Sequence, residues 1–136
     1  MRKFKGGIVI NREIKFRVWD NTTKEMLQLQ KMSFKTSKCM PYGGNIEYEF
    51  DNLMQYTGLK DIDNKEIYEG DILQGGYANK LTGGFESRLY VVEFEKGTFK
   101  GKLIGESPYG DTWLNFLNKK SYVIGNIYEN PELLEV

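Results

Sequence analysis

Hydrophobic and polar residues alternate along several short stretches of the chain, at the two-residue period of a β-strand. Residues 12–20 place three aliphatic or aromatic side chains on one face and Lys15 and Arg17 on the other. We predict a half-buried strand there. We interpret its two cations as an ordinary face toward solvent or a sheet edge rather than a functional basic patch. Residues 45–50 and 88–95 are predicted to be strands on the same criterion.

Residues 53–73 are the stretch around which the predicted fold is organised. An apolar, β-prone run ends at Gly58, and residues 60–65 are polar, with Asp and Asn side by side. A second short β-prone run follows, and Gly70–Asp71 then turns the chain into another apolar pair. This pattern predicts a strand, a turn, a strand, a tight corner and a third strand.

Glycine residues mark predicted loops and irregularities in the second half of the chain. Residues 75–84 are bracketed by glycine pairs and are predicted to form a long mobile loop, whose spacing does not match a phosphate-binding loop. Residues 98–104 are predicted to return from the strand at 88–95, and Gly101 indicates a bulge or a close backbone approach. Residues 112–117 fit either a short strand or a single helical turn.

The end of the chain completes the predicted architecture. A last strand is predicted over residues 122–127, and Asn130 and Pro131 are typical of the cap and first position of a short C-terminal helical turn. About nine or ten short strands joined by turns predict a mainly β fold class. We expect one or more small antiparallel barrel-like domains that include an SH3-like barrel element, a likeness of fold that carries no function.

Composition then excludes several classes of function. The 136 residues suit one domain, and 19 basic residues balance 19 acidic ones, which disfavours a strongly basic nucleic-acid-binding domain. Histidine is absent, so His-based triads, metal sites and pH switches are excluded. Cys39 is alone and is predicted to be a buried, inert thiol. No apolar run approaches the roughly 20 residues of a membrane span, so we expect a cytoplasmic protein.

Acidic side chains are the main candidates for chemistry. The densest group lies in and near the central turn and consists of Asp61, Asp63, Asn64, Glu66 and Asp71. Oxygen ligands suit calcium or magnesium, but the spacing fails the EF-hand template, and we interpret the group as a solvated turn. A weaker candidate for paired carboxylates comprises Glu47, Glu49, Glu93 and Glu95, which alternation points toward solvent. We therefore assign no catalytic, cofactor-binding or metal-binding residue, and we expect no cofactor.

Aromatic residues are in surplus. The chain has two tryptophans, nine tyrosines and eight phenylalanines, which exceed what a small β core easily hides. We predict some exposed aromatic surface, and hence self-association or a protein partner. The most interesting candidates, each of which also fits a core position, are Trp19, Tyr42, Tyr56, Tyr68, Tyr77, Tyr109 and Trp113.

Three segments of the chain resemble one family. REIKFRVWD at residues 12–20, YTGLKDIDNKEIYEGDIL at 56–73 and VIGNIYENP at 123–131 are similar, in that order, to the YopX family of phage and prophage proteins. The resemblance implies a phage origin in Gram-positive bacteria and a mainly β fold. The family has no established reaction, so the resemblance transfers no catalytic residue. Asn64 stands where a turn glycine is expected, and asparagine tolerates the left-handed conformation.

The resemblance also bears on domain organisation and function. Residues 1–11 precede the usual family start and form an N-terminal extension, while residues 12–136 form one domain or two β subdomains, 12–57 and 58–136. We favour a non-enzymatic binding protein, a homo-oligomer that contacts a host or phage protein and no membrane. The alternative is a small-barrel nucleic-acid-binding module that uses the lysines and aromatics of residues 31–38. A metal-dependent enzyme is the third hypothesis.

Overall fold

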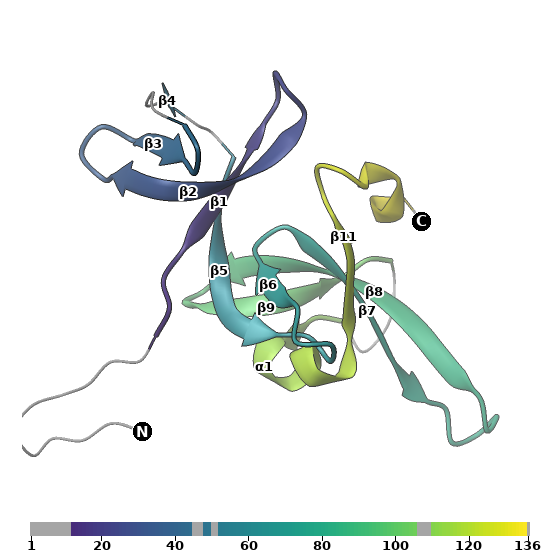
Figure 1. The fold of residues 1–136 in the computed structure, drawn as a ribbon. Coiled ribbons are helices and arrows are strands. Elements are labelled where there is room, and N and C mark those ends of the chain that lie inside the picture. Colours follow the sequence, from purple (N-terminus) through teal and green to yellow (C-terminus); the bar gives the residue numbers. More distant parts are fainter. Residues whose placement is uncertain (1–11, 45–47, 50–51, 106–109, 136) are drawn as a thin grey trace, which may run out of the picture.

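The computed structural model describes residues 12–44, 48–49, 52–105 and 110–135, and it is mainly β (Figure 1). Its strands form two antiparallel sheets, one of six strands and one of five. The predicted mainly β fold class is therefore confirmed. Within these residues neither sheet closes into a barrel, and the likeness to an SH3-like barrel stays a prediction, as does the division into two subdomains.

The first sheet has the strand order β4-β3-β2-β1-β5-β6. Its strands are β1 (Phe16–Asp20), β2 (Glu25–Ser33), β3 (Lys38–Pro41), β4 (Tyr48–Glu49), β5 (Leu53–Lys60) and β6 (Glu66–Tyr68). The second sheet has the order β10-β9-β8-β7-β11. Its strands are β7 (Asp71–Ala78), β8 (Phe85–Glu95), β9 (Thr98–Leu103), β10 (Thr112–Trp113) and β11 (Tyr122–Asn126).

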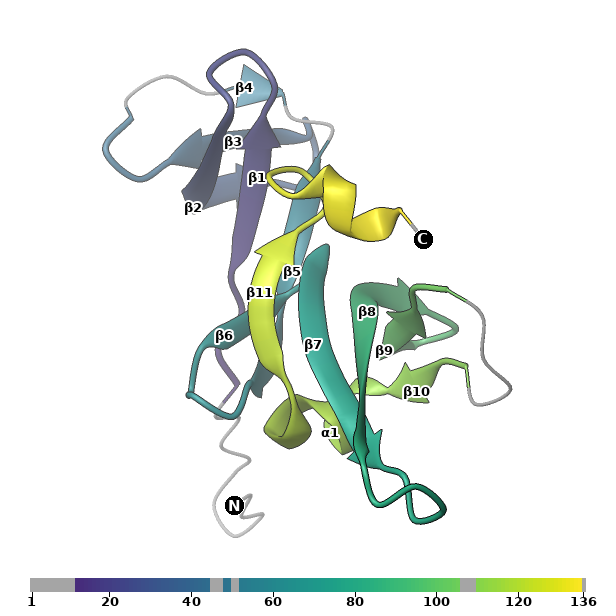
Figure 2. The same cartoon turned by 90° about the vertical axis from the view of Figure 1, so that its right-hand side faces the viewer.

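Short helical turns lie beside the last strands. They are α1 (Leu114–Leu117), η1 (Asn118–Lys120) and η2 (Pro131–Leu134). None of the helices in the described ranges is long and apolar enough to cross a membrane. Both views place β11 between β6 and β7 (Figures 1 and 2), so the last strand of the chain lies where the two sheets approach one another.

Two hydrophobic clusters form the core, and the larger one joins the sheets. The smaller lies in the first sheet and includes Val18 and Cys39, so the predicted buried thiol is confirmed. The larger comprises Ile67, Leu73, Tyr90, Val92, Leu114 and Leu117. Ile67 belongs to β6 of the first sheet, whereas the others come from the second sheet and α1. Burial of Ile67 therefore ties the edge of one sheet to the core of the other.

The predicted turn chemistry is confirmed in the central stretch. Asn64 has a φ of 64°, the left-handed conformation that the turn requires. Asp61 holds this turn, because one of its carboxylate oxygens accepts hydrogen bonds from the backbone of Asp63 at 2.8 Å and of Lys65 at 2.9 Å. Gly70 has a φ of 84° at the corner before β7.

Several predicted boundaries are wrong. Residues 75–78 belong to β7, so the long loop predicted over 75–84 is a short turn from residue 79 to 84 within a hairpin. Glycine serves close packing there: a Cβ on Gly76 would lie 2.1 Å from the carbonyl oxygen of Glu86. Residues 31–44, whose sequence has no clean hydrophobic period, include the end of β2 and all of β3, and β5 continues past Gly58.

The remaining predictions near the C-terminus are refined rather than overturned. Residues 112–117 contain both predicted alternatives, a two-residue strand followed by a helical turn. The helical turn beginning at Pro131 is confirmed, but Asn130 makes no side-chain cap, since its amide oxygen accepts a hydrogen bond from the backbone of Asn126 at 3.2 Å.

The strand predicted over 45–50 is observed at residues 48–49, and its other residues lie outside the described ranges.

Gly101 provides a test of packing between β9 and α1. A Cβ at this position would lie 2.6 Å from Cδ2 of Leu117, which confirms the close approach predicted from the sequence. We expect Gly101→Ala to reduce the free energy of unfolding by about 1–3 kcal/mol, because the buried leucine must shift. Gly110→Ala is the control, since a Cβ there meets nothing within 4 Å. Urea unfolding should show at most about 0.5 kcal/mol of change for this control, and equal losses in both variants would contradict the packing argument.

Candidate functional site

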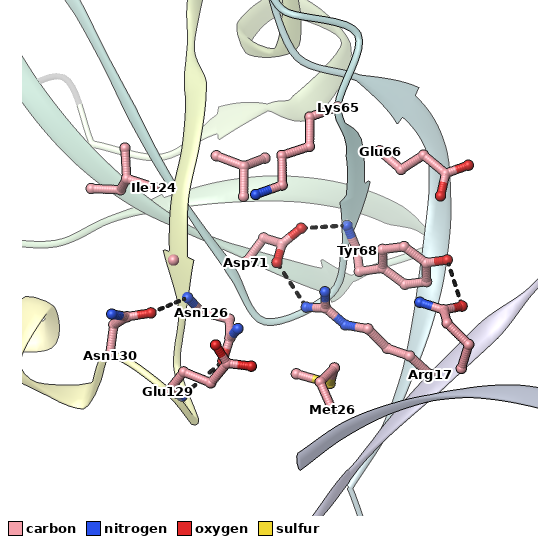
Figure 3. A pocket seen from close by; sticks show the side chains of 13 residues that line it. Arg17, Met26, Lys65, Glu66, Tyr68, Asp71, Ile124, Asn126, Glu129 and Asn130 are labelled. Atoms are coloured by element: carbon pink, nitrogen blue, oxygen red, sulfur yellow. Dashed lines mark hydrogen bonds and ion pairs between the residues drawn. The ribbon is translucent and has the colours of Figure 1, made fainter. Parts of the chain in front are cut away.

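A pocket of about 490 Å³ lies where the two sheets meet, and it is the candidate functional site (Figure 3). Its lining residues come from β1, β2, β6, β7 and β11 and from the turns beside them. These elements include all three segments that carried the sequence resemblance. Arg17 comes from the first, Tyr68 and Asp71 from the second, and Asn126 from the third. The fold thus brings distant segments to one place, which their spacing in the sequence did not predict.

A buried ion pair between the sheets forms the centre of the site. Nη2 of Arg17 donates to a carboxylate oxygen of Asp71 at 2.7 Å, and the other oxygen accepts from the backbone N–H of Tyr68 at 2.8 Å. Arg17 is 8% exposed and Asp71 is 2% exposed. The prediction that Arg17 faces solvent is wrong, because the chain at the corner before β7 covers that face of β1.

The guanidinium of Arg17 has further partners. Nη2 also donates to the carbonyl oxygen of Glu69 at 3.4 Å, and the guanidinium carbon lies 4.5 Å from the ring centroid of Tyr68. The hydroxyl of Tyr68 donates to the side-chain oxygen of Gln28 at 3.1 Å, which links β6 to β2. Arg17 and Tyr68 are therefore held in place from both sheets.

Charge and burial oppose one another at the carboxyl group of Asp71. Burial raises the pKa of Asp71 above its usual value, while the charge of Arg17 and the hydrogen bond from Tyr68 act to lower it.

Lys15 forms ion pairs with Glu66 and Glu13 and lies over the ring of Tyr56, with 5.0 Å between ammonium and centroid. Its hydrogen bond to Glu66 raises the pKa of Lys15 above the usual range.

The wall opposite β6 is shaped by the turn after β11. The side-chain oxygen of Asn126 accepts hydrogen bonds from the backbone of Tyr128 at 3.0 Å and of Glu129 at 2.9 Å. A Cβ on Gly125 would lie 2.3 Å from the amide oxygen of Asn130, so this wall needs glycine. Asp61 fixes β11 from the other side by accepting a hydrogen bond from the backbone of Val123 at 2.9 Å.

The predicted acidic group does not form a cation site. Asp61 holds a turn, Glu66 pairs with Lys15, and Asp71 pairs with Arg17. The interpretation of a solvated turn is wrong for Asp61 and Asp71, which are each 2% exposed. Among the residues that the structure describes, no three His, Cys, Asp or Glu side chains are grouped to hold a metal ion.

Of the four strand glutamates, the three that the structure describes do not line the pocket. Glu49 and Glu93 are exposed, and Glu95 pairs with Lys102 at 2.7 Å, which lowers the pKa of Glu95. Glu47 lies outside the described residues. The interpretation that these glutamates face solvent is confirmed for Glu49 and Glu93.

A second feature is an aromatic pair from β10 and α1, beside β9. It lies at the edge of the second sheet opposite β11. Trp113 is 53% exposed and Phe116 is 61% exposed, and their rings stack with 5.7 Å between centroids. A groove of about 300 Å³ adjoins them and is also lined by Lys100, Asp111 and Thr112. This pair is called the aromatic patch below.

The predicted exposed aromatic surface is confirmed for part of the candidate set. Tyr42 is 71% exposed and Trp113 is 53% exposed. Three other candidates, Trp19, Tyr56 and Tyr68, are buried. Tyr109 and the side chain of Tyr77 lie outside what the structure describes. Phe116 was not singled out from the sequence, although its place three residues after Trp113 allows the two rings to share one face of a helical turn.

The chain is a mainly β protein with a pocket between its two sheets. Its described residues hold no group of metal ligands, and without histidine they offer no His-based triad. The chain belongs to the YopX family, because the family model described as YopX protein matches residues 15–135. A comparison with curated proteins finds no match. Among solved structures, the chain is similar to the crystal structure of protein EF1440 from Enterococcus faecalis, with 30% sequence identity, a TM-score of 0.58, and coverage of 92% of this chain and 100% of that one.

The ion pair at the centre of the pocket gives a prediction about stability. Asp71→Asn keeps the size of the side chain but leaves the buried charge of Arg17 without its partner. We expect a loss of about 3–5 kcal/mol in the free energy of unfolding, measured by urea denaturation. Glu93→Gln removes one exposed carboxylate and should change it by at most about 0.5 kcal/mol. A loss below about 1 kcal/mol for Asp71→Asn would contradict this prediction, because it would mean that water solvates the guanidinium of Arg17 in place of the carboxylate.

Proposed function

We propose that the protein is a non-enzymatic binding protein that acts through protein–protein contacts, including contacts with a second copy of itself. The observation that carries this proposal is the aromatic patch, in which Trp113 and Phe116 stack on one another and each remains more than half exposed. Tryptophan is enriched among residues that dominate binding energy, because it buries a large rigid surface at small entropic cost.

The surroundings of the aromatic patch favour a specific contact. Lys102 pairs with Glu95 at 2.7 Å and with Asp111 at 3.3 Å, and Asp111 also accepts a hydrogen bond from the backbone of Leu103 at 3.0 Å. The pair of rings is therefore bordered by fixed polar groups. An apolar centre with a polar rim is the ordinary anatomy of a protein–protein interface.

The setting of the proposed function follows from family membership. The resemblance implies a phage or prophage protein, so the partner is proposed to be a host or phage protein in the cytoplasm of the infected cell. The balanced charge of 19 basic and 19 acidic residues and the absence of histidine support binding rather than catalysis. No residue is proposed to be catalytic and no cofactor is proposed.

The proposal predicts that substitution of the aromatic patch weakens association. The double variant Trp113→Ser, Phe116→Ser should lose self-association in analytical ultracentrifugation and should lose any nuclease-resistant protein captured from host lysate. Each central aromatic side chain contributes about 2 kcal/mol, equivalent to roughly 30-fold in Kd. Leu81→Ser is the control, because Leu81 is 97% exposed in the turn between β7 and β8. A wild-type chain that stays monomeric and captures the same proteins as the double variant would contradict the proposal.

A second candidate function is supported by the hairpin of β2 and β3. Lys31, Lys35 and Lys38 are exposed there, and Phe34 between them is 87% exposed. The alternative interpretation of this segment, that its apolar side chains face the core, is wrong for Phe34. Cations around an exposed ring suit a single-stranded nucleic acid.

Binding to a labelled single-stranded oligonucleotide, measured by fluorescence anisotropy, tests this second candidate. Three neutralised phosphates predict that log K falls with log salt at a slope of about −2. Substituting all three lysines by glutamine should remove both the binding and its salt dependence. The absence of any binding at low salt would exclude this candidate.

A further inference from the structure

We propose that the pocket between β6 and β11 binds a small molecule through its carboxylate or phosphate group, with Arg17 and Lys65 as the groups that receive the oxyanion. This inference is independent of the aromatic patch, which lies beside β9 and α1 and does not contribute to the pocket's lining. It assigns a ligand class to the site at which the three resembling segments meet.

The first observation is an unsatisfied donor on Arg17. The Nε atom of Arg17 is buried and has no hydrogen-bond partner in the described part of the chain. The side chain as a whole is 10% exposed. Both hydrogen bonds that the guanidinium makes to Asp71 and Glu69 leave from Nη2. A buried cationic donor without an acceptor costs free energy, and an oxyanion at the guanidinium would recover it.

The second observation is that the acidic groups near Arg17 are already occupied. One oxygen of Asp71 accepts from Arg17 and the other from the backbone of Tyr68, while Glu66 is paired with Lys15. Neutralised carboxylates neither attract a cation strongly nor repel an anion strongly. Among the charged lining residues that the structure describes, Lys65 and Glu129 therefore remain without an ion pair.

Lys65 supplies the second donor. Its side chain points into the space beside Asp71 in Figure 3, and the structure shows no ion pair for it among the described residues. The positive charge of Lys65 also acts to lower the pKa of Asp71, an effect smaller than that of burial. Because Asp71 cancels the charge of Arg17, Lys65 is the cation of the described lining that remains without an ion pair.

The size of the pocket indicates a molecule larger than a bare ion. A volume of about 490 Å³ falls within the range of about 300–1,000 Å³ that small-molecule sites occupy. Met26 and Val123 give the lining an apolar component, and Gln28 and Asn126 add amide groups. This mixture suits a small organic molecule whose anionic group lies at Arg17 and Lys65.

Glu129 is the exposed carboxylate in the lining, and it opposes an anionic ligand. Removing its charge should strengthen oxyanion binding, whereas removing the charge of Lys65 should weaken it. General attraction of anions to the protein would give the same signs, so a change of charge far from the pocket must leave binding unchanged if the site is specific. Both residues are exposed, and neither is needed for the core.

The direct test follows the Nε–Hε resonance of Arg17 in a ¹⁵N-correlated NMR spectrum. Its signal is assigned by its loss in Arg17→Lys, against the signals of Arg2, Arg12 and Arg88. Sodium phosphate and sodium acetate are titrated separately at constant ionic strength with sodium chloride. We expect a saturable shift of the Arg17 signal. Saturation by phosphate alone assigns a phosphate-bearing ligand, and saturation by both anions assigns the carboxylate class as well.

Matched variants make the test specific. Lys65→Gln should weaken binding about tenfold, as expected for loss of a charge-assisted hydrogen bond, and Glu129→Gln should strengthen it severalfold. Lys80→Gln removes one exposed positive charge from the turn between β7 and β8 and should leave Kd unchanged. These three variants keep Arg17 and so do not depend on the fold tolerating its loss. Either a lack of saturation with both anions or equal weakening in Lys65→Gln and Lys80→Gln would overturn the proposal, without affecting the protein-binding function.

Discussion

The buried ion pair between Arg17 and Asp71 is the interaction on which the rest of the structure depends. It joins β1 of the first sheet to the first residue of β7 in the second, across 54 positions of sequence. Two charges removed from water are stable only when each finds partners, and Asp71 has a guanidinium on one oxygen and a backbone N–H on the other. Together with Ile67, which enters the core of the second sheet, this pair specifies how the two sheets meet.

Sequence reasoning predicted the strands and turns better than the pairing of charges. Alternation and β-propensity located most strands because both depend on neighbouring residues. The left-handed turn at Asn64 was predicted for the same reason, whereas at Gly101 the sequence predicted a bulge or a close approach without identifying Leu117 as the neighbour. The loop at 75–84 was predicted wrongly because glycine serves both mobile loops and close packing, and only the tertiary structure distinguishes the two uses.

The candidate site lay beyond what one sequence can predict. Arg17 alternates with apolar residues and so has the pattern of a solvent-facing side chain, yet a segment more than 50 residues away covers it. Asp61 and Asp71 had the pattern of a polar turn, but each carboxylate accepts hydrogen bonds that burial makes necessary. The nearest sequence signal was the position of these residues within the segments that resemble the YopX family. The signal indicated importance without indicating its physical reason.

The position of β11 has a consequence for how the pocket comes to exist during synthesis. Val123 binds Asp61 across 62 residues, and Asn126 pairs with Asp71 in the sheet, so both contacts require the last strand. Contacts of such long sequence separation close late and slow the folding of β proteins. On the ribosome, the corner at Asp71 emerges well before β11 does. The nascent chain therefore lacks one wall of the pocket until residues 122–126 have been synthesised.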